Sequence, residues 1–230
     1  AQERPADGLV GEEFGNENKD AARYWVIDPI DGTKNFMRGV PTWATLIGLV
    51  ERQDDGSEKV IVGAVSAPAL NRRWYASTGK GAFTTLNNGT PRKIAVSKVS
   101  KIADASIAYS DFQGWGDRLP KFHNLIADCT RSRGYGDFWS HMLVAEGAVD
   151  IAVDNTLVGD ITNASCEAAS IFNDEGSNTS DVEQPKHDSK KTSTWLCHVS
   201  TVGGIISYEP VIKMKIPWSK FRLRSGSEGI

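Results

Sequence analysis

Trp25-Val26-Ile27-Asp28-Pro29-Ile30-Asp31-Gly32-Thr33-Lys34-Asn35-Phe36 is the stretch that decides how this chain is interpreted. The apolar run at its start predicts a short buried strand, and Gly32 and Thr33 break that pattern. Asp28 and Asp31 follow the run, separated by a proline and an isoleucine. Buried charge needs compensation, whereas hard divalent cations prefer oxygen ligands. The stretch therefore favours a cation site at the end of a strand.

A second acidic strand end lies upstream, where residues 8–11 predict a short strand that runs into Glu12 and Glu13. If the two strands are neighbours, Glu12, Asp28 and Asp31 converge at one end of a sheet. Magnesium suits such a place because it takes a few carboxylates, a carbonyl oxygen and several waters. The kink at Pro29 would turn the Ile30 carbonyl toward the ions.

The turn after these carboxylates has the features of an anion cradle. Gly32 and Thr33 offer backbone N–H groups to a phosphate, and a helix after Thr33 would add its dipole. The Thr33 hydroxyl would lie where it can orient a water. An isolated Asp-Pro-X-Asp-Gly is more often a surface turn. The chemical interpretation depends on the whole set of residues occurring in order.

Composition sets broad bounds on function. The 230 residues fit one large domain or two small ones, and the net charge of −3 is dispersed. This predicts neither a nucleic-acid surface nor a membrane span, and the polar N-terminus is no signal peptide, so we expect a cytoplasmic protein. Cys129, Cys166 and Cys197 show neither zinc spacing nor a disulfide framework and are expected to be reduced thiols.

The remaining pattern predicts a mixed α and β fold with two layers of sheet and intervening helices. Tight turns between the early strands indicate an antiparallel meander. We expect a metal- and phosphate-binding sheet region over 1–105, an α/β substrate-side region over 106–176, and a divergent segment over 177–230. The predicted strands are 41–50, 60–65, 73–76, a fourth that follows a turn over 79–83, 106–110 and 149–153. The predicted helices are 119–130, 138–147 and 164–172, and 173–192 is a solvated loop or disordered linker.

The chain resembles the inositol monophosphatase family of magnesium-dependent phosphatases. The resemblance is carried by Gly11-Glu12-Glu13, by Asp28-Pro29-Ile30-Asp31-Gly32-Thr33-Lys34-Asn35-Phe36, and by Ala67-Pro68 with Gly79-Lys80-Gly81-Ala82-Phe83. Within the family it is most similar to actinobacterial-type histidinol-phosphate phosphatases, through Gly39-Val40-Pro41-Thr42-Trp43-Ala44, Ser66-Ala67-Pro68-Ala69-Leu70 and Arg133-Gly134-Tyr135-Gly136-Asp137-Phe138-Trp139. The similarity is dense over residues 8–154.

The resemblance implies a layered αβαβα sandwich and direct attack by metal-activated water, with two or three Mg²⁺ ions. It implies that Glu12 binds the first metal and helps catalysis, that Asp28 and the Ile30 carbonyl hold the metals, and that Asp31 is a catalytic ligand of the second metal. Gly32 and Thr33 would bind the phosphate, with Thr33 also activating the water.

Three further acids are candidates, and each has an alternative. Asp137 precedes a predicted helix, so it is a candidate N-cap. It is also a candidate contact to a cationic substrate, and one residue can have both roles. Asp154 ends a predicted strand where the resemblance places an acidic substrate contact. Asp160 is the nearest candidate for a further metal ligand, although the tryptophan that precedes this aspartate in the family is absent. The family's two N-terminal helices are also missing, which would leave a sheet face uncovered.

The leading hypothesis is a magnesium-dependent phosphatase acting on a small phosphorylated metabolite, histidinol phosphate first. Inositol phosphate or a sugar phosphate is the alternative substrate. An impaired or truncated homologue that binds metal or a partner without turnover is the alternative of another class. No nucleic acid or membrane partner is expected, and a homodimer is an analogy with the family.

Overall fold

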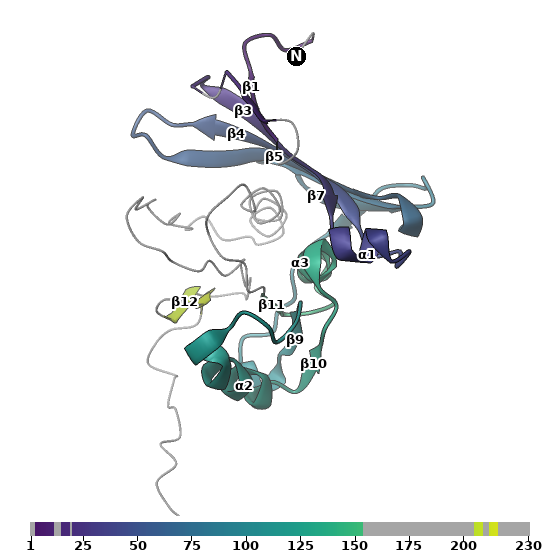
Figure 1. The fold of residues 1–230 in the computed structure, drawn as a ribbon, viewed down its shortest axis with the longest axis vertical. Helices are drawn as coiled ribbons and strands as arrows, with labels where there is room; N and C mark the ends of the chain where they lie inside the picture. Colours follow the sequence, from purple (N-terminus) through teal and green to yellow (C-terminus); the bar gives the residue numbers. More distant parts are fainter. Residues whose placement is uncertain (1–2, 12–14, 19, 154–204, 209–211, 216–230) are drawn as a thin grey trace, which may run out of the picture.

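The computed structural model describes residues 3–11, 15–18, 20–153, 205–208 and 212–215. In that part of the chain, eight strands form one twisted sheet in the order β2-β1-β3-β4-β5-β6-β7-β8 (Figure 1). The strands are β1 (Gly8–Gly11), β2 (Gly15–Glu17), β3 (Arg23–Asp31), β4 (Ala44–Arg52), β5 (Glu58–Ala67), β6 (Arg72–Ser77), β7 (Gly81–Leu86) and β8 (Arg92–Ile94).

The predicted meander is confirmed from β3 to β8, where each strand pairs antiparallel with the next. The exception is β1, which pairs parallel with β3. Gly11 lies opposite Ile27, so both strands reach the same edge of the sheet. The expectation that these two strands are neighbours is therefore confirmed.

A second sheet follows along the chain, with strand order β10-β9-β11 and parallel pairing. Two helices lie on its opposite faces. The strands alternate accordingly: Ile107 packs in a cluster with Phe122 of α2, whereas its neighbour Ala108 packs with Val144 of α3. The elements are β9 (Ser106–Tyr109), α2 (Leu119–Asp128), β10 (Arg131–Arg133), α3 (Asp137–Ala145) and β11 (Ile151–Val153).

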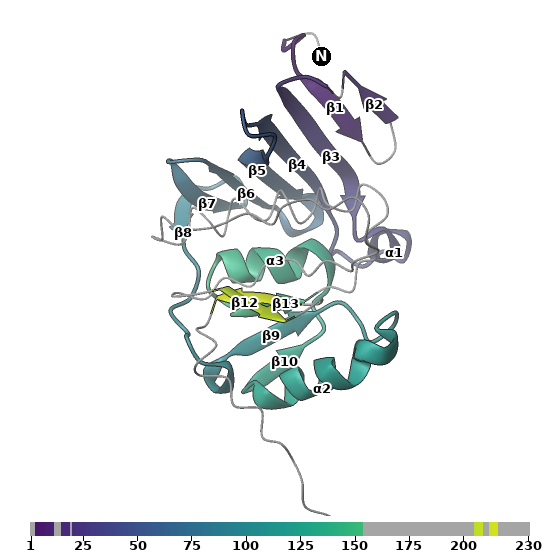
Figure 2. The same ribbon diagram turned by 90° about the vertical axis from the view of Figure 1, so that its left-hand side faces the viewer.

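Helix α3 lies between the two sheets (Figure 2). Its Phe138 and Met142, each at most 2% exposed, pack with Trp74 in the core of the large sheet. The resulting order of sheet, helix, sheet and helix confirms the mixed α/β sandwich and the last four layers of the predicted αβαβα arrangement. The proposed domain boundaries remain a prediction.

The C-terminal end of α3 is anchored to the large sheet by one carboxylate. Glu146 accepts hydrogen bonds from Arg72 at 2.6 Å and from the Trp74 indole, and it forms an ion pair with Arg92 at 3.4 Å. Its side chain is only 8% exposed. Hydrogen bonds to a charged group contribute more than neutral ones, so this cluster fixes where α3 lies on the sheet.

The shorter elements complete the described chain. They are α1 (Thr33–Met37), the 3₁₀ turns η1 (Pro68–Leu70), η2 (Ile102–Asp104) and η3 (Gly116–Arg118), and a hairpin of β12 (Ile205–Tyr208) and β13 (Ile212–Lys215). The helix predicted over 164–172 and the loop predicted over 173–192 lie outside the described residues.

Candidate active site

The end of β3 is kinked where the sequence places its two aspartates. Asp28 pairs with Leu46 and Asp31 with Ala44, so β3 carries one extra residue in this interval. The Thr45 hydroxyl donates to the Pro29 carbonyl at 2.8 Å, and the Asp28 carboxylate accepts from the Ile30 N–H at 3.0 Å. Such a bulge bends the strand and redirects the groups beyond it.

The two aspartates lie in different surroundings. Asp28 is 8% exposed, on the face of the sheet that packs against the core, whereas Asp31 is half-buried at the strand's last position. A carboxylate as buried as Asp28 is retained only where polar or cationic groups compensate it. One such group is the Ile30 N–H, and a bound cation would be another.

A sharp turn at Gly32 follows. Gly32 has φ 80°, in the left-handed region, and a Cβ there would lie 2.9 Å from the Thr42 carbonyl oxygen and 3.2 Å from Asp137 Oδ2. A side chain has no room at this position. The Thr33 hydroxyl donates to the Ile30 carbonyl at 3.0 Å. The predicted helix after Thr33 is present as α1, but it has only five residues, so the backbone N–H groups matter more than its dipole.

Asp31 connects this turn to the start of α3. Its Oδ2 accepts a hydrogen bond from the Phe138 N–H at 2.7 Å, across 107 positions of sequence. The first N–H groups of a helix have no partner within the helix, and a carboxylate is well suited to them. Asp31 thus caps α3 from another part of the chain while keeping acceptor capacity for a cation.

The expectation that Asp137 is the N-cap of α3 is wrong. Gly136 occupies the cap position, and it has no side chain with which to cap the helix. Asp137 is the first helical residue, with an unusual φ of 47°. Its Oδ2 accepts from Asn35 at 3.1 Å, so the carboxylate lies over the Gly32 turn.

The sequence pattern indicates no role for Asn35 or Thr42. The Asn35 side-chain amide joins the Thr42 carbonyl, the Thr42 hydroxyl and Asp137. No local spacing indicates this contact, because Asn35 and Asp137 are 102 positions apart.

The described donors fit a magnesium site in part. Asp28, Asp31 and the Ile30 carbonyl supply oxygen only, the donor type that Mg²⁺ prefers. Among the residues that the structure describes, no three His, Cys, Asp or Glu side chains gather into a metal-binding group. The predicted ligands Glu12 and Asp160 lie outside the described residues, as does the predicted substrate contact Asp154.

Cys129 is not a candidate nucleophile. Burial raises the pKa of its thiol to about 12, and the charges of Asp128 and Asp150 act in the same direction. The thiol is therefore protonated at neutral pH, and only a thiolate is strongly nucleophilic.

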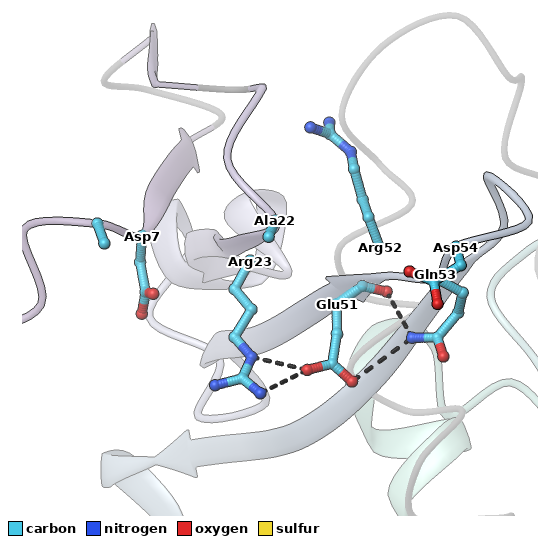
Figure 3. Close-up of a pocket in the computed structure, with 8 residues that line it drawn as sticks. Asp7, Ala22, Arg23, Glu51, Arg52, Gln53 and Asp54 are labelled. Carbon is cyan, nitrogen blue, oxygen red and sulfur yellow. Dashed lines mark hydrogen bonds and ion pairs between the residues drawn. The ribbon is translucent and has the colours of Figure 1, made fainter.

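A separate hollow of about 510 Å³ lies at the opposite end of β3, between the N-terminal segment and the start of the strand (Figure 3). It is lined by Asp7, Arg23 and Glu51 among others. Arg23 donates two hydrogen bonds to Glu51, at 2.7 and 2.5 Å, and thereby lowers the pKa of that carboxyl. Eight steps of extended strand, roughly 26 Å, separate Arg23 from Asp31, so the hollow is no part of the turn.

The chain is similar in sequence to two histidinol-phosphatases. It is 51% identical over 156 residues to a histidinol-phosphatase of Streptomyces coelicolor, covering 67% of this chain and 58% of the relative. It is 49% identical to a histidinol-phosphatase of Mycobacterium tuberculosis, covering 66% and 58%. The chain thus spans somewhat over half the length of these relatives.

The structure is also similar to a solved structure. The crystal structure of the extragenic suppressor protein suhB from Bartonella henselae aligns with a TM-score of 0.63 at 26% identity, covering 76% of this chain and 64% of that one. Of the helices that can be described, none is long and apolar enough to cross a bilayer. The profile of the inositol monophosphatase family matches residues 1–166, which include the entire kinked strand end and the start of α3. The chain therefore belongs to the inositol monophosphatase family.

Proposed function

We propose that this chain is a magnesium-dependent phosphomonoesterase that acts on a small phosphate ester, with histidinol phosphate as the substrate. The observation that carries the proposal is the end of β3. Six consecutive residues, 28–33, combine two carboxylates and a carbonyl with a glycine turn that has no room for a side chain. Cation ligands and an anion cradle side by side suit a phosphate ester bound together with its metal.

The residues that would hold the metal are Asp28, Asp31 and the Ile30 carbonyl, with Glu12 and Asp160 as the ligands expected from the resemblance. The Ile30 carbonyl already accepts one hydrogen bond from Thr33, and a carbonyl oxygen has a second lone pair for a cation. The chemistry that Mg²⁺ supplies when bound is Lewis-acid polarisation of the phosphoryl group and activation of the attacking water. We propose two or three ions, as in the family.

Thr33 has a role that its hydrogen bond defines. A hydroxyl has one hydrogen to donate and two lone pairs. Because the Thr33 hydrogen is directed at the Ile30 carbonyl, its lone pairs remain to accept a hydrogen bond from the attacking water. The side chain is exposed, so water reaches it. The backbone N–H groups of Gly32 and Thr33 would hold the phosphate.

Asp137 supports the choice of a cationic ester. Its carboxylate lies 3.2 Å from the point where a Gly32 Cβ would be, beside the proposed cradle. A negative charge there disfavours a phosphate dianion, unless the substrate brings a positive group of its own. Histidinol phosphate carries an ammonium and an imidazole that titrates near neutral pH. The two relatives at about 50% sequence identity are named histidinol-phosphatases, which supports the same substrate.

Phosphate release from histidinol phosphate and from inositol 1-phosphate, with Mg²⁺ and with EDTA, tests the proposal. We expect release that requires Mg²⁺, favours histidinol phosphate, and falls at least roughly hundredfold in Asp31→Asn, which removes a charge at the site. Asp117→Asn, an exposed position in η3, is the matched control for loss of one carboxylate. Thermal unfolding of each variant shows that it is folded.

The outcomes separate the alternatives. Release that persists in EDTA, or in folded Asp31→Asn, contradicts the mechanism. A preference for inositol 1-phosphate would favour the other substrate class. Release from neither ester by folded wild-type protein would favour a homologue that binds without turnover.

A further inference from the structure

We propose that Asn35 is a positioning residue that fixes the Asp137 carboxylate over the Gly32 turn, and that this contact sets a preference for phosphate esters carrying a positive charge. The inference rests on the proposed function, because it concerns selectivity at the same site. It assigns a task to a side chain that lies outside the set of expected ligands and phosphate contacts.

The hydrogen bonds of Asn35 determine the orientation of its amide. Nδ2 lies 3.0 Å from the Thr42 carbonyl, 3.1 Å from the Thr42 hydroxyl oxygen and 3.1 Å from Asp137 Oδ2. An amide nitrogen has two hydrogens, so one serves the two oxygens of Thr42 and the other is directed at Asp137. The reversed amide would place Oδ1 against three oxygens. The orientation is thus fixed by its surroundings.

The backbone of Asn35 is held as firmly as its side chain. Its carbonyl accepts from the Arg38 N–H at 3.1 Å and from the Val40 N–H at 2.9 Å, which close the end of α1. Asn35 is therefore tied to α1, to the segment before β4 through Thr42, and to the start of α3 through Asp137. Because both its backbone and its half-buried side chain are hydrogen-bonded, Asn35 can hold the Asp137 carboxylate in a fixed position.

The contact matters because it determines where the Asp137 charge lies. Asp137 begins α3 with a φ of 47°, and Gly136 rather than Asp137 occupies the N-cap position. Loss of the hydrogen bond from Asn35 would weaken the hold on the carboxylate at the turn, and the attraction between the carboxylate and a bound ester falls as their separation grows. The hydrogen bond to Asn35 holds the charge close to the cradle, where it attracts a cationic substituent and penalises a neutral one.

The test uses three variants of the full chain: Asn35→Ala, Asp137→Asn and the double variant. Asp137→Asn keeps an oxygen that can accept from Asn35 but removes the charge. The measured quantity is kcat/KM for histidinol phosphate divided by kcat/KM for inositol 1-phosphate. Each single variant should lower this ratio roughly tenfold to hundredfold, the range for a hydrogen bond or charge contact to an ionised group. Asn124→Ala, at an exposed position of α2, is the control and should leave the ratio unchanged.

The double variant distinguishes positioning from a general structural role. If Asn35 acts through Asp137, the ratio in the double variant equals that in Asp137→Asn. A merely structural role would lower kcat/KM for both esters alike and would add to the effect of Asp137→Asn. Either of these two results overturns the inference.

A binding measurement keeps the inference separate from the proposed function. If the wild-type chain hydrolyses neither ester, the proposed function fails, and calorimetric dissociation constants for the two esters decide the role of Asn35. A wild-type preference for histidinol phosphate that is lost in Asn35→Ala supports positioning. Equal affinities in the wild-type chain, or an unchanged preference in the variant, contradict it.

Discussion

Replacing Gly32 by alanine should damage both the fold and the site, and Gly39→Ala provides a matched comparison. Both glycines have a positive φ, 80° at Gly32 and 72° at Gly39. They differ in their surroundings. A Cβ at Gly32 would lie 2.9 Å from the Thr42 carbonyl oxygen and 3.2 Å from Asp137 Oδ2, whereas a Cβ at Gly39 meets nothing within 4 Å.

The comparison separates two energies. An alanine in the left-handed region costs about 1–2 kcal/mol, and Gly39→Ala should lose only that much of the free energy of unfolding. Gly32→Ala must in addition displace the backbone at Thr42, and such overpacking costs about 1–3 kcal/mol more. Alanine also stiffens the unfolded chain, but this effect is the same in both variants and cancels in the difference.

Urea unfolding followed by tryptophan fluorescence measures both values, provided that the slopes agree. We expect Gly32→Ala to be less stable than Gly39→Ala by about 1–3 kcal/mol. We also expect phosphate release to be lost in Gly32→Ala under conditions where the protein is folded, since relief of the clash with the Thr42 carbonyl must move the backbone that carries the Gly32 and Thr33 N–H groups. Equal stability of the two variants would show that the turn relaxes easily, and full activity in Gly32→Ala would remove this turn from the site.

Two further predictions concern buried groups. Glu146→Gln should lower the free energy of unfolding by about 3 kcal/mol, because it leaves a partly buried Arg72 without its counter-ion. Glu51→Gln, which breaks an ion pair at the surface, should lower it by less than about 1 kcal/mol. Similar losses for the two variants in urea unfolding would contradict this prediction. In a Cys166→Ser/Cys197→Ser background, the remaining thiol of Cys129 should resist Ellman's reagent at pH 8.5, because folding raises its pKa. For the same reason, the contribution of this thiol to the free energy of unfolding should be complete below pH 9.0 and should be lost as the pH rises toward about 12. Rapid labelling of the folded protein would show that the thiol is accessible and ionised.

The sequence predicted those parts of the fold that depend on local pattern. Apolar runs bounded by turn residues indicated β3 to β7, and the tight turns between them indicated antiparallel pairing. The parallel pairing of β1 with β3 does not follow from local sequence pattern. Residues 8–11 predict a strand, but four residues do not indicate which strand is the partner or whether the pairing is parallel. Only the proximity of the two acidic strand ends, expected on chemical grounds, indicated that these strands are neighbours.

In the site, the sequence predicted contacts between residues close in the chain but not contacts between distant ones. The hydrogen bonds among residues 28–33 follow from a bulge, a proline and a glycine that are adjacent in sequence. The cap prediction for Asp137 failed because Gly136 takes the cap position with φ 75° and ψ 160°. Asp31 then caps the helix from β3, a choice that depends on how α3 lies on the sheet. Nothing in the residues around either aspartate encodes that placement.

These contacts make α3 the element that joins the stability of the fold to the geometry of the site. Its C-terminal end is anchored through Glu146 to Arg72 of β6, and its N-terminal end contacts Asp31 and Asn35. A shift of α3 along the sheet would therefore remove the hydrogen bond that orients Asp31 and would carry Asp137 away from the turn. The aspartates that the sequence suggests as ligands are held in place by a helix more than a hundred positions downstream, so the motif alone, separated from α3, would have the right donors without their arrangement.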